Sequence, residues 1–241
     1  MDLAKQLERT RAEDSAATTS AELDALWQRI EPETVGARRS WRSRLRELST
    51  PKRVGLVLLG TIALSAIVMI VLGGMRGDLA SGGLVARYAL ALLGLCVLAG
   101  AVFAVALRGA HQRPLGVVGW VIVSLAVVVP LALSLLPSVW TADGGRTLAV
   151  VDGCNVIGCT TGLFAGVLAW LFQRSTTPVT VRVLASAAGG GVIAFAMLQL
   201  HCPADNVEHL LLGHSIVGVI LVAAAGLGLG IRRVVMSRRR S

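Results

Sequence analysis

The chain has 241 residues, a formal net charge of +9 and a mean hydropathy of +0.71, and 54% of its residues are apolar. This composition excludes an ordinary water-soluble domain and is typical of a polytopic membrane protein. The basic balance does not indicate nucleic-acid binding, because the excess of Lys and Arg lies in segments that flank apolar runs.

Residues 1–53 contain no long apolar run and are predicted to form a cytoplasmic N-terminal segment. Within it, Thr19-Ser20-Ala21-Glu22 fits a capping box, in which the first hydroxyl and the last carboxylate satisfy backbone N–H groups at a helix start. An amphipathic helix is therefore predicted over residues 20–31, and Pro32 ends it. Its apolar stripe, at spacings i, i+3, i+4 and i+7, consists of Leu23, Leu26, Trp27 and Ile30.

This apolar stripe needs a partner surface, because an isolated helix of about 12 residues is marginal in water. Docking into a groove of a soluble protein is one alternative, since the helix-in-groove mode uses this spacing and Trp is a frequent anchor. Packing on lipid headgroups or on the protein's own cytoplasmic loops is a second alternative, and disorder is a third. The pattern alone leaves the three open.

The stretch from residue 37 to residue 53 is basic, with seven Lys or Arg residues interleaved with Trp41, Leu45 and Leu48. It is predicted to form a juxtamembrane helix on anionic lipid, where each cation near the surface contributes on the order of 1 kcal/mol. Membrane lipid is therefore an expected partner of this segment.

Six apolar runs follow, and none of them contains Asp, Glu, Lys or Arg. Each is close to or above the roughly 20 residues that a helix needs to cross a hydrocarbon core of about 30 Å. The predicted fold class is all-α, a polytopic membrane protein with six transmembrane helices and a short N-terminal cytoplasmic helical segment. Small residues such as the glycine triplet 189–191 are expected to allow close helix packing rather than to break a helix. The predicted spans are 54–75, 88–107, 114–137, 153–173, 183–202 and 209–231.

The distribution of Lys and Arg predicts the orientation of the chain. Cations are concentrated before the first span, in alternate connections and after the last span, whereas the other connections hold most of the acidic residues. By the positive-inside rule both termini are cytoplasmic, with residues 232–241 as a basic cytoplasmic tail, and an even number of spans agrees with this.

Three of the four cysteines and three of the four histidines fall at one predicted membrane face, the outer one. Sulfur and imidazole are ligands for zinc or copper, two cysteines there could instead form a disulfide, and simple packing of these side chains is a third alternative. Residues five apart lie about 140° from each other on an ideal α-helix, so neither Cys154 and Cys159 nor His209 and His214 are expected to chelate from one unbroken helix. Ligation is expected to combine different helices, either Cys154 with Cys202 and His209, or Cys159 with His214.

Several activities are disfavoured by what the spans contain. A proton-coupled transporter usually needs an ionisable residue inside the membrane, and the six runs have no acidic residue, Lys or Arg. A thiol oxidase would need closely paired outer cysteines, and no nucleophilic triad is visible, so the chain is not expected to be an enzyme. A small-molecule or metal transporter and a membrane thiol or redox protein remain the alternatives to a regulatory role.

A short N-terminal helix, six compact spans and the run Leu200-His201-Cys202-Pro203, followed by Glu208-His209-Leu210 and Gly213-His214, resemble the NrsF-type bacterial membrane proteins. These negatively regulate an extracytoplasmic-function (ECF) sigma factor, and the pattern is also similar to CarR, a six-span anti-sigma factor. The resemblance covers roughly residues 20–231. It implies a multi-pass protein of the bacterial inner membrane that holds a sigma factor through its cytoplasmic segment.

The same resemblance implies a role for the outer cysteines in perceiving the stress that releases the sigma factor, be it a metal, a redox change or light. Cys202 is the position that matches the pattern best, and Cys154 or Cys159 is its companion. A zinc or copper ion is the cofactor that this cluster would take, with Cys154, Cys202, His209 and His214 as its candidate ligands.

Overall fold

The computed structural model describes residues 45, 47–74, 82–108, 115–136, 151–173, 180–202 and 206–238. The predicted amphipathic helix 20–31 and most of the basic stretch 37–53 lie outside the described residues. The described residues therefore belong almost entirely to the six apolar runs and their ends. The residues that this leaves out include the whole predicted partner-binding stripe, Leu23, Leu26, Trp27 and Ile30.

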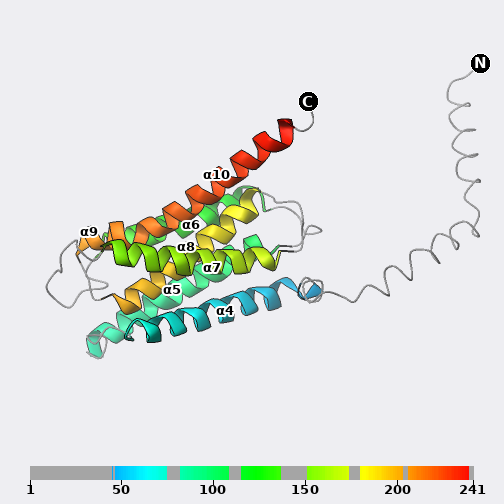
Figure 1. Cartoon of the computed structure of the whole chain (residues 1–241). Helices are drawn as coiled ribbons and strands as arrows, with labels where there is room; N and C mark the ends of the chain where they lie inside the picture. The colour runs from blue at the N-terminus through cyan, green and yellow to red at the C-terminus, as the bar shows by residue number, and fades with distance from the viewer. Residues whose placement is uncertain are drawn as a thin grey trace, which may run out of the picture. The chain divides into compact units, whose positions relative to one another are not determined.

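Every regular element among the described residues is a helix, and six helical segments are long and apolar enough to cross a membrane (Figure 1). The predicted fold class, all-α with six spans, is confirmed. The first five segments are α4 (Thr50–Val71), α5 (Gly82–Ala106), α6 (Val117–Ser134), α7 (Val151–Leu171) and α8 (Thr180–His201). The sixth is composite and consists of α9 (Val207–His209), the π-helical turn η4 (Leu210–Ser215) and α10 (Ile216–Arg238).

The helices differ from the predicted spans mainly at their ends. α4 begins four residues before residue 54, with Pro51 in its first turn, where a missing N–H leaves no hydrogen bond unmade. It ends at Val71 and is followed by Gly73 and Gly74, whose φ angles of 98° and 95° are readily adopted by glycine. At the other end of the chain α10 continues to Arg238, so much of the predicted tail is helical.

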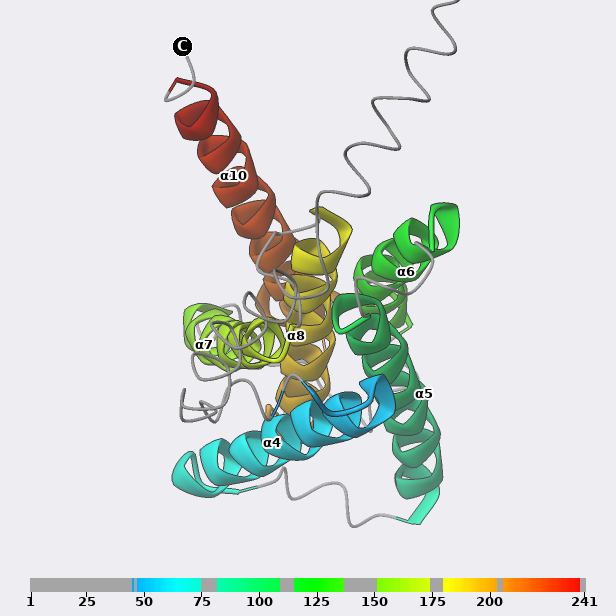
Figure 2. The ribbon, with the colours of Figure 1, turned by 90° about the vertical axis from the view of Figure 1, so that its right-hand side faces the viewer.

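α8 lies at the centre of the bundle, with the other long helices around it (Figure 2). In its spanning window 72% of the residues are buried, against 17–39% in the other five spans. Small residues let helix backbones approach closely, which matters in a membrane because lipid provides no hydrophobic driving force for helix association. The small buried residues of α8 are Ala185, Ser186, Ala188, Gly189, Gly190, Gly191 and Ala194.

The three consecutive glycines of α8 face three different neighbours, since successive residues are about 100° apart around a helix. A Cβ atom at Gly189 would lie 2.5 Å from the ring of Phe103 in α5. At Gly190 it would overlap the carbonyl oxygen of Gly162 in α7, and at Gly191 it would lie 2.5 Å from the backbone of α10. The triplet lies within an unbroken helix, so the expected packing role is confirmed.

Arg53 departs from the expectation that the basic residues before the first span contact lipid headgroups, because its side chain is fully buried. Its Nη1 donates a hydrogen bond of 2.9 Å to the carbonyl oxygen of Phe172, directly after α7. Its Nε and Nη2 donate bonds of 3.1 Å to the Leu48 carbonyl and the Thr50 hydroxyl. A cation is favoured at a helix C-terminus, so Arg53 joins the start of α4 to the end of α7.

Candidate metal centre

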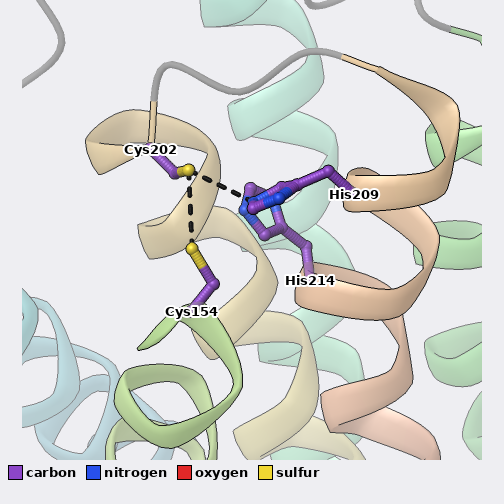
Figure 3. Close-up of side chains that lie close together, drawn as sticks. All are labelled: Cys154, Cys202, His209 and His214. Carbon is purple, nitrogen blue, oxygen red and sulfur yellow. Dashed lines mark hydrogen bonds between the residues drawn. The ribbon is translucent and has the colours of Figure 1, made fainter. Parts of the chain in front are cut away.

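Four sulfur and imidazole side chains meet at the end of the bundle opposite Arg53 (Figure 3). Cys154 lies in the first turn of α7, and Cys202 directly follows α8. His209 ends α9, and His214 lies in η4. Three of the six spans therefore contribute donors to one cluster, which we call the Cys2His2 cluster.

The donor atoms of the Cys2His2 cluster are close enough to share one ion. The Cys154 and Cys202 sulfurs are 3.5 Å apart, and the Cys202 sulfur lies 3.4 Å from Nε2 of His209. One donor atom from each of the four residues falls within 4.8 Å of the others, and all four side chains are buried. The His209 and His214 rings meet edge to face, with centroids 5.1 Å apart. The predicted combination of Cys154, Cys202 and His209 from different helices is thus brought together in space.

The expectation that His209 and His214 diverge around their helix is wrong. It assumed an α-helix, in which five residues span about 140° beyond a full turn. The segment Leu210–Ser215 is instead a π-helical turn. Hydrogen bonds from residue i to residue i+5 widen that turn, so residues five apart come onto the same side. Both imidazoles therefore face Cys202, and the alternative pair of Cys159 with His214 is not formed.

The π-helical turn is held by hydroxyl groups from within the bundle. The Ser134 hydroxyl at the end of α6 lies within hydrogen-bond distance of the Leu210 carbonyl and of the Ser215 hydroxyl, and its single proton can be donated to either. The Ser215 hydroxyl in turn donates a 3.0 Å hydrogen bond to the carbonyl of Pro130. On the preceding turn, the Asn206 side chain accepts a 2.7 Å bond from the His209 N–H and so caps α9. These bonds compensate for the departure from regular α-helix.

Gly213 leaves the space in which the His209 ring lies. A Cβ atom built at Gly213 would come within 3.2 Å of Nε2 of His209, tighter than ordinary van der Waals contact. The nitrogen on the other side of that ring, Nδ1, is buried and has no hydrogen-bond partner among the described residues. Because Nε2 is the nitrogen that lies against Cys202, His209 presents Nε2 rather than Nδ1 to the cluster.

The geometry of the Cys2His2 cluster fits a tetrahedral metal site. Bonds of about 2.3 Å to sulfur and about 2.0–2.1 Å to nitrogen give edges of about 3.8 Å between two sulfurs and about 3.6 Å between sulfur and nitrogen. The observed separations of 3.5 Å and 3.4 Å are close to these edges. Two thiols and two imidazoles in this arrangement are typical of a structural zinc site, and thiolates also bind Cu(I).

The other sulfur and imidazole side chains lie apart from the cluster. Cys159 is half-buried further along α7 and does not belong to the group of donors. The Nδ1 of His201 is instead hydrogen-bonded, at 2.9 Å, to the carbonyl of Gly74 after α4. Cys96 on α5 is exposed on the outside of the bundle, and His111 lies outside the described residues.

Polar residues inside the apolar runs were the signal that the sequence analysis passed over. Ser134 and Ser215 are buried and hold the π-helical turn. Gln199, three residues before Cys202, is fully buried, and both polar atoms of its amide lack hydrogen-bond partners among the described residues. A polar side chain is costly in a span, so each of these marks a position with a specific role.

Comparison with known proteins identifies a family. The family described as NrsF, negative regulator of sigma F, matches residues 42–234, which is more than half of the chain and includes the first five spans and the sixth as far as residue 234. No curated protein and no solved structure matches the chain.

Proposed function

Because the chain belongs to the NrsF family of negative regulators of sigma F, we propose that it is an anti-sigma factor that holds an ECF sigma factor at the bacterial inner membrane. The family match carries this proposal, since it implies a sigma-factor partner. The six apolar spans supply the membrane anchor. The positive-inside distribution of Lys and Arg supports a cytoplasmic location for both termini, where a sigma factor is accessible.

The N-terminal segment is the proposed docking element for the sigma factor. Its stripe of Leu23, Leu26, Trp27 and Ile30 has the spacing with which an amphipathic helix fills an apolar groove. The family match begins at residue 42, so this part of the proposal rests on the amphipathic pattern alone. Occupation of a groove that RNA polymerase would otherwise contact makes the inhibition competitive.

The Cys2His2 cluster is the proposed sensor, and a zinc or copper ion is its proposed signal or structural ligand. The donor set and the separations between the donor atoms support metal binding over simple packing. Such an ion would supply a fixed cross-link between α7, α8 and η4. The chain's own contribution is to hold the four donors in register through the π-helical turn.

Oxidation of the same two thiols is a second candidate, favoured by the 3.5 Å separation of the Cys154 and Cys202 sulfurs. A peroxide would accept two electrons from the thiols, each sulfur would lose one proton, and one S–S bond would replace the O–O bond with release of water. A bond of about 2.05 Å requires the two sulfurs to approach by more than 1 Å. Either event would shift α7 against α8.

α7 offers a direct mechanical route from the cluster to the opposite end of the bundle. Cys154 lies in its first turn, and the carbonyl of Phe172, directly after its last turn, is bonded to Arg53. Arg53 in turn lies at the start of α4, which follows the N-terminal segment. We propose that a shift of α7 changes this contact and so alters how the N-terminal segment is presented. A bias of a few kcal/mol at that contact is sufficient to release a bound partner.

Co-purification from the native host tests the anti-sigma proposal. The detergent-solubilised full chain, compared with a chain lacking residues 1–50, should retain a sigma factor that the truncated chain loses. Both chains must be recovered from the membrane fraction in equal amounts for the comparison to count. If truncation changes nothing that co-purifies, the docking role of the segment is excluded, and a transport or redox role would then have to be tested instead.

Metal binding at the cluster is tested by matched variants of the purified chain. Cys202→Ser and His209→Gln should each remove stoichiometric binding of Zn²⁺ or Cu⁺, because each deletes one donor of four. Cys159→Ser and His201→Gln change the same residue types outside the cluster and should leave binding intact. Formation of a Cys154–Cys202 disulfide under peroxide, with no metal bound in the reduced chain, would favour the redox alternative.

A further inference from the structure

A groove on the outside of the bundle lies over α8, between α7 and α10. Its volume is about 380 Å³, at the lower end of the range of ligand pockets. α7 contributes Gly162, Gly166 and Trp170, and α10 contributes Leu221, Ala224 and Ala225. None of the four Cys2His2 residues lines this groove, and it takes no part in the function proposed above.

The groove forms where α7 and α10 separate. Near the cluster the two helices touch, since a Cβ at Gly158 would meet Val217 at 2.9 Å and a Cβ at Gly162 would meet Leu221 at 2.6 Å. Beyond these contacts α10 diverges from α7 toward its C-terminal end (Figure 1). The small residues of both helices leave the space between them open, with α8 as its floor.

The lining of the groove suits hydrocarbon. Its one hydroxyl is that of Ser186 on α8, which already donates to the Arg182 carbonyl and accepts from the Gln173 amide. The other polar group of the lining is the N–H of Trp170, in the last turn of α7, and the remaining lining residues are apolar or glycine. Because the groove opens to the outside of a membrane-spanning bundle, an acyl chain is the occupant with matching chemistry.

A cationic side chain, Arg232, lies beyond one end of the groove. Arg232 is seven residues after Ala225, a spacing that brings it back to nearly the same side of α10 and about 10.5 Å further along. It is exposed, and the neighbouring Arg233 donates a 2.6 Å hydrogen bond to the hydroxyl of Thr180, the first residue of α8. Because Thr180 begins α8, that contact places Arg233 and the adjacent Arg232 at the end of the bundle, at the depth where lipid headgroups begin.

Trp170 also places the end of the groove at the boundary between hydrocarbon and headgroups. It lies in the last turn of α7, and 55% of its side chain is exposed. Tryptophan is enriched at the boundary between hydrocarbon and headgroups, where its ring is partly apolar and its N–H reaches polar groups. An apolar groove that ends at a tryptophan and an arginine matches an acyl chain followed by a phosphate.

We propose that this groove binds one anionic phospholipid, with an acyl chain between α7 and α10 and its phosphate at Arg232. The site would stabilise the separation of the two helices by filling the space between them. The site is expected to prefer anionic lipids, because a headgroup with a net negative charge is attracted by the Arg232 guanidinium more strongly than a zwitterionic headgroup is.

Native mass spectrometry of the full chain, titrated with dioleoyl phosphatidylglycerol or dioleoyl phosphatidylcholine, tests the site. The first lipid to bind should prefer phosphatidylglycerol by roughly fivefold, the effect of one cation near the headgroup. Arg232→Gln should abolish this preference and retain binding of both lipids. Ala224→Phe, which fills the groove, should weaken the binding of both.

Two controls on α10 lie away from the groove. Arg238→Gln removes the same charge about one and two-thirds turns further on, and Ala223→Phe adds the same bulk on the opposite side of α10, so neither should change lipid binding. Equal occupancy by the two lipids in the unmodified chain, or an unchanged preference in Arg232→Gln, would overturn the proposal. A dimer that disappears in Ala224→Phe would assign the groove to a second copy of the chain. If Ala224→Phe does not fold, the exposed Arg232→Gln variant still decides.

Discussion

Replacement of Arg53 by methionine tests the contact between α4 and α7. Methionine keeps an unbranched apolar stem but removes the three hydrogen bonds that the guanidinium donates. The Thr50 hydroxyl and the Leu48 carbonyl are only half-buried, so water can replace the guanidinium there. The bond to the Phe172 carbonyl is buried, and its loss leaves an acceptor without compensation.

The size of the effect follows from these three bonds. A buried acceptor left without its charged donor costs about 1.5–3 kcal/mol, and the loss of a cation at the C-terminus of α7 adds about 0.3–1 kcal/mol. Arg53→Met should therefore lower the free energy of unfolding by about 2–4 kcal/mol. Arg53→Lys, which can reach one acceptor as a point charge, should lose roughly half as much.

Lys52→Met is the matched control, because Lys52 is the preceding residue, carries the same charge and is exposed. A surface change of this kind typically stays within about 0.5 kcal/mol. Unfolding of the full chain in detergent, followed by circular dichroism, measures both variants. If Arg53→Met and Lys52→Met were equally stable, the contact of Arg53 with the Phe172 carbonyl would contribute no net free energy of folding. The proposed coupling from the Cys2His2 cluster through α7 to α4 would then lose its physical basis.

Three further predictions concern the partner, the packing and the π-helical turn. Trp27→Asp should weaken sigma-factor binding at least about 30-fold, as expected for an interface anchor worth about 2 kcal/mol. Gln28→Asp on the polar face should leave binding unchanged, and equal co-purification of the sigma factor with both variants would exclude the apolar stripe as its docking surface. Gly190→Ala should destabilise the bundle by about 3 kcal/mol in detergent unfolding, while Gly94→Ala, where a Cβ meets nothing within 4 Å, should be neutral or stabilising. Ser215→Ala should lower metal affinity about 10–100-fold in a Zn²⁺ titration without deleting a donor, and unchanged affinity would show that its hydrogen bonds do not position the imidazoles.

The six spans could be predicted from the sequence because a membrane imposes one rule on every residue of a span. Backbone polar groups must be satisfied internally and side chains must be apolar, so a run of about 20 uncharged residues leaves little choice of structure. The central place of α8 was also visible in principle, since its glycine triplet offers a close approach on three sides. Helix ends were less predictable, because Pro51 and the Gly73-Gly74 pair act locally.

The buried position of Arg53 could not be predicted by the same reasoning. Rules for cations at membrane boundaries place them among headgroups, and Arg53 is one of seven Lys or Arg residues between residues 37 and 53. Its main partner is the carbonyl of Phe172, 119 residues away. Every residue has a backbone carbonyl, so the sequence cannot indicate which one the guanidinium will bind. Only the tertiary arrangement of α4 and α7 distinguishes this buried arginine from the exposed Lys52 beside it.

The residues of the candidate site were predicted from the sequence, but their local geometry was not. Counting along the spans placed Cys154, Cys202 and His209 at one end of the bundle, because helical rise converts position in a span into depth. The place of His214 depended on angle rather than depth, and the angle changes when an α-helix gives way to a π-helical turn. Such a turn is unfavourable unless its displaced carbonyls find donors, and here the donor to Leu210 is a serine on a different helix. In this chain, the two histidines come onto one side of the sixth span at a turn to which α6 supplies the compensating hydroxyl.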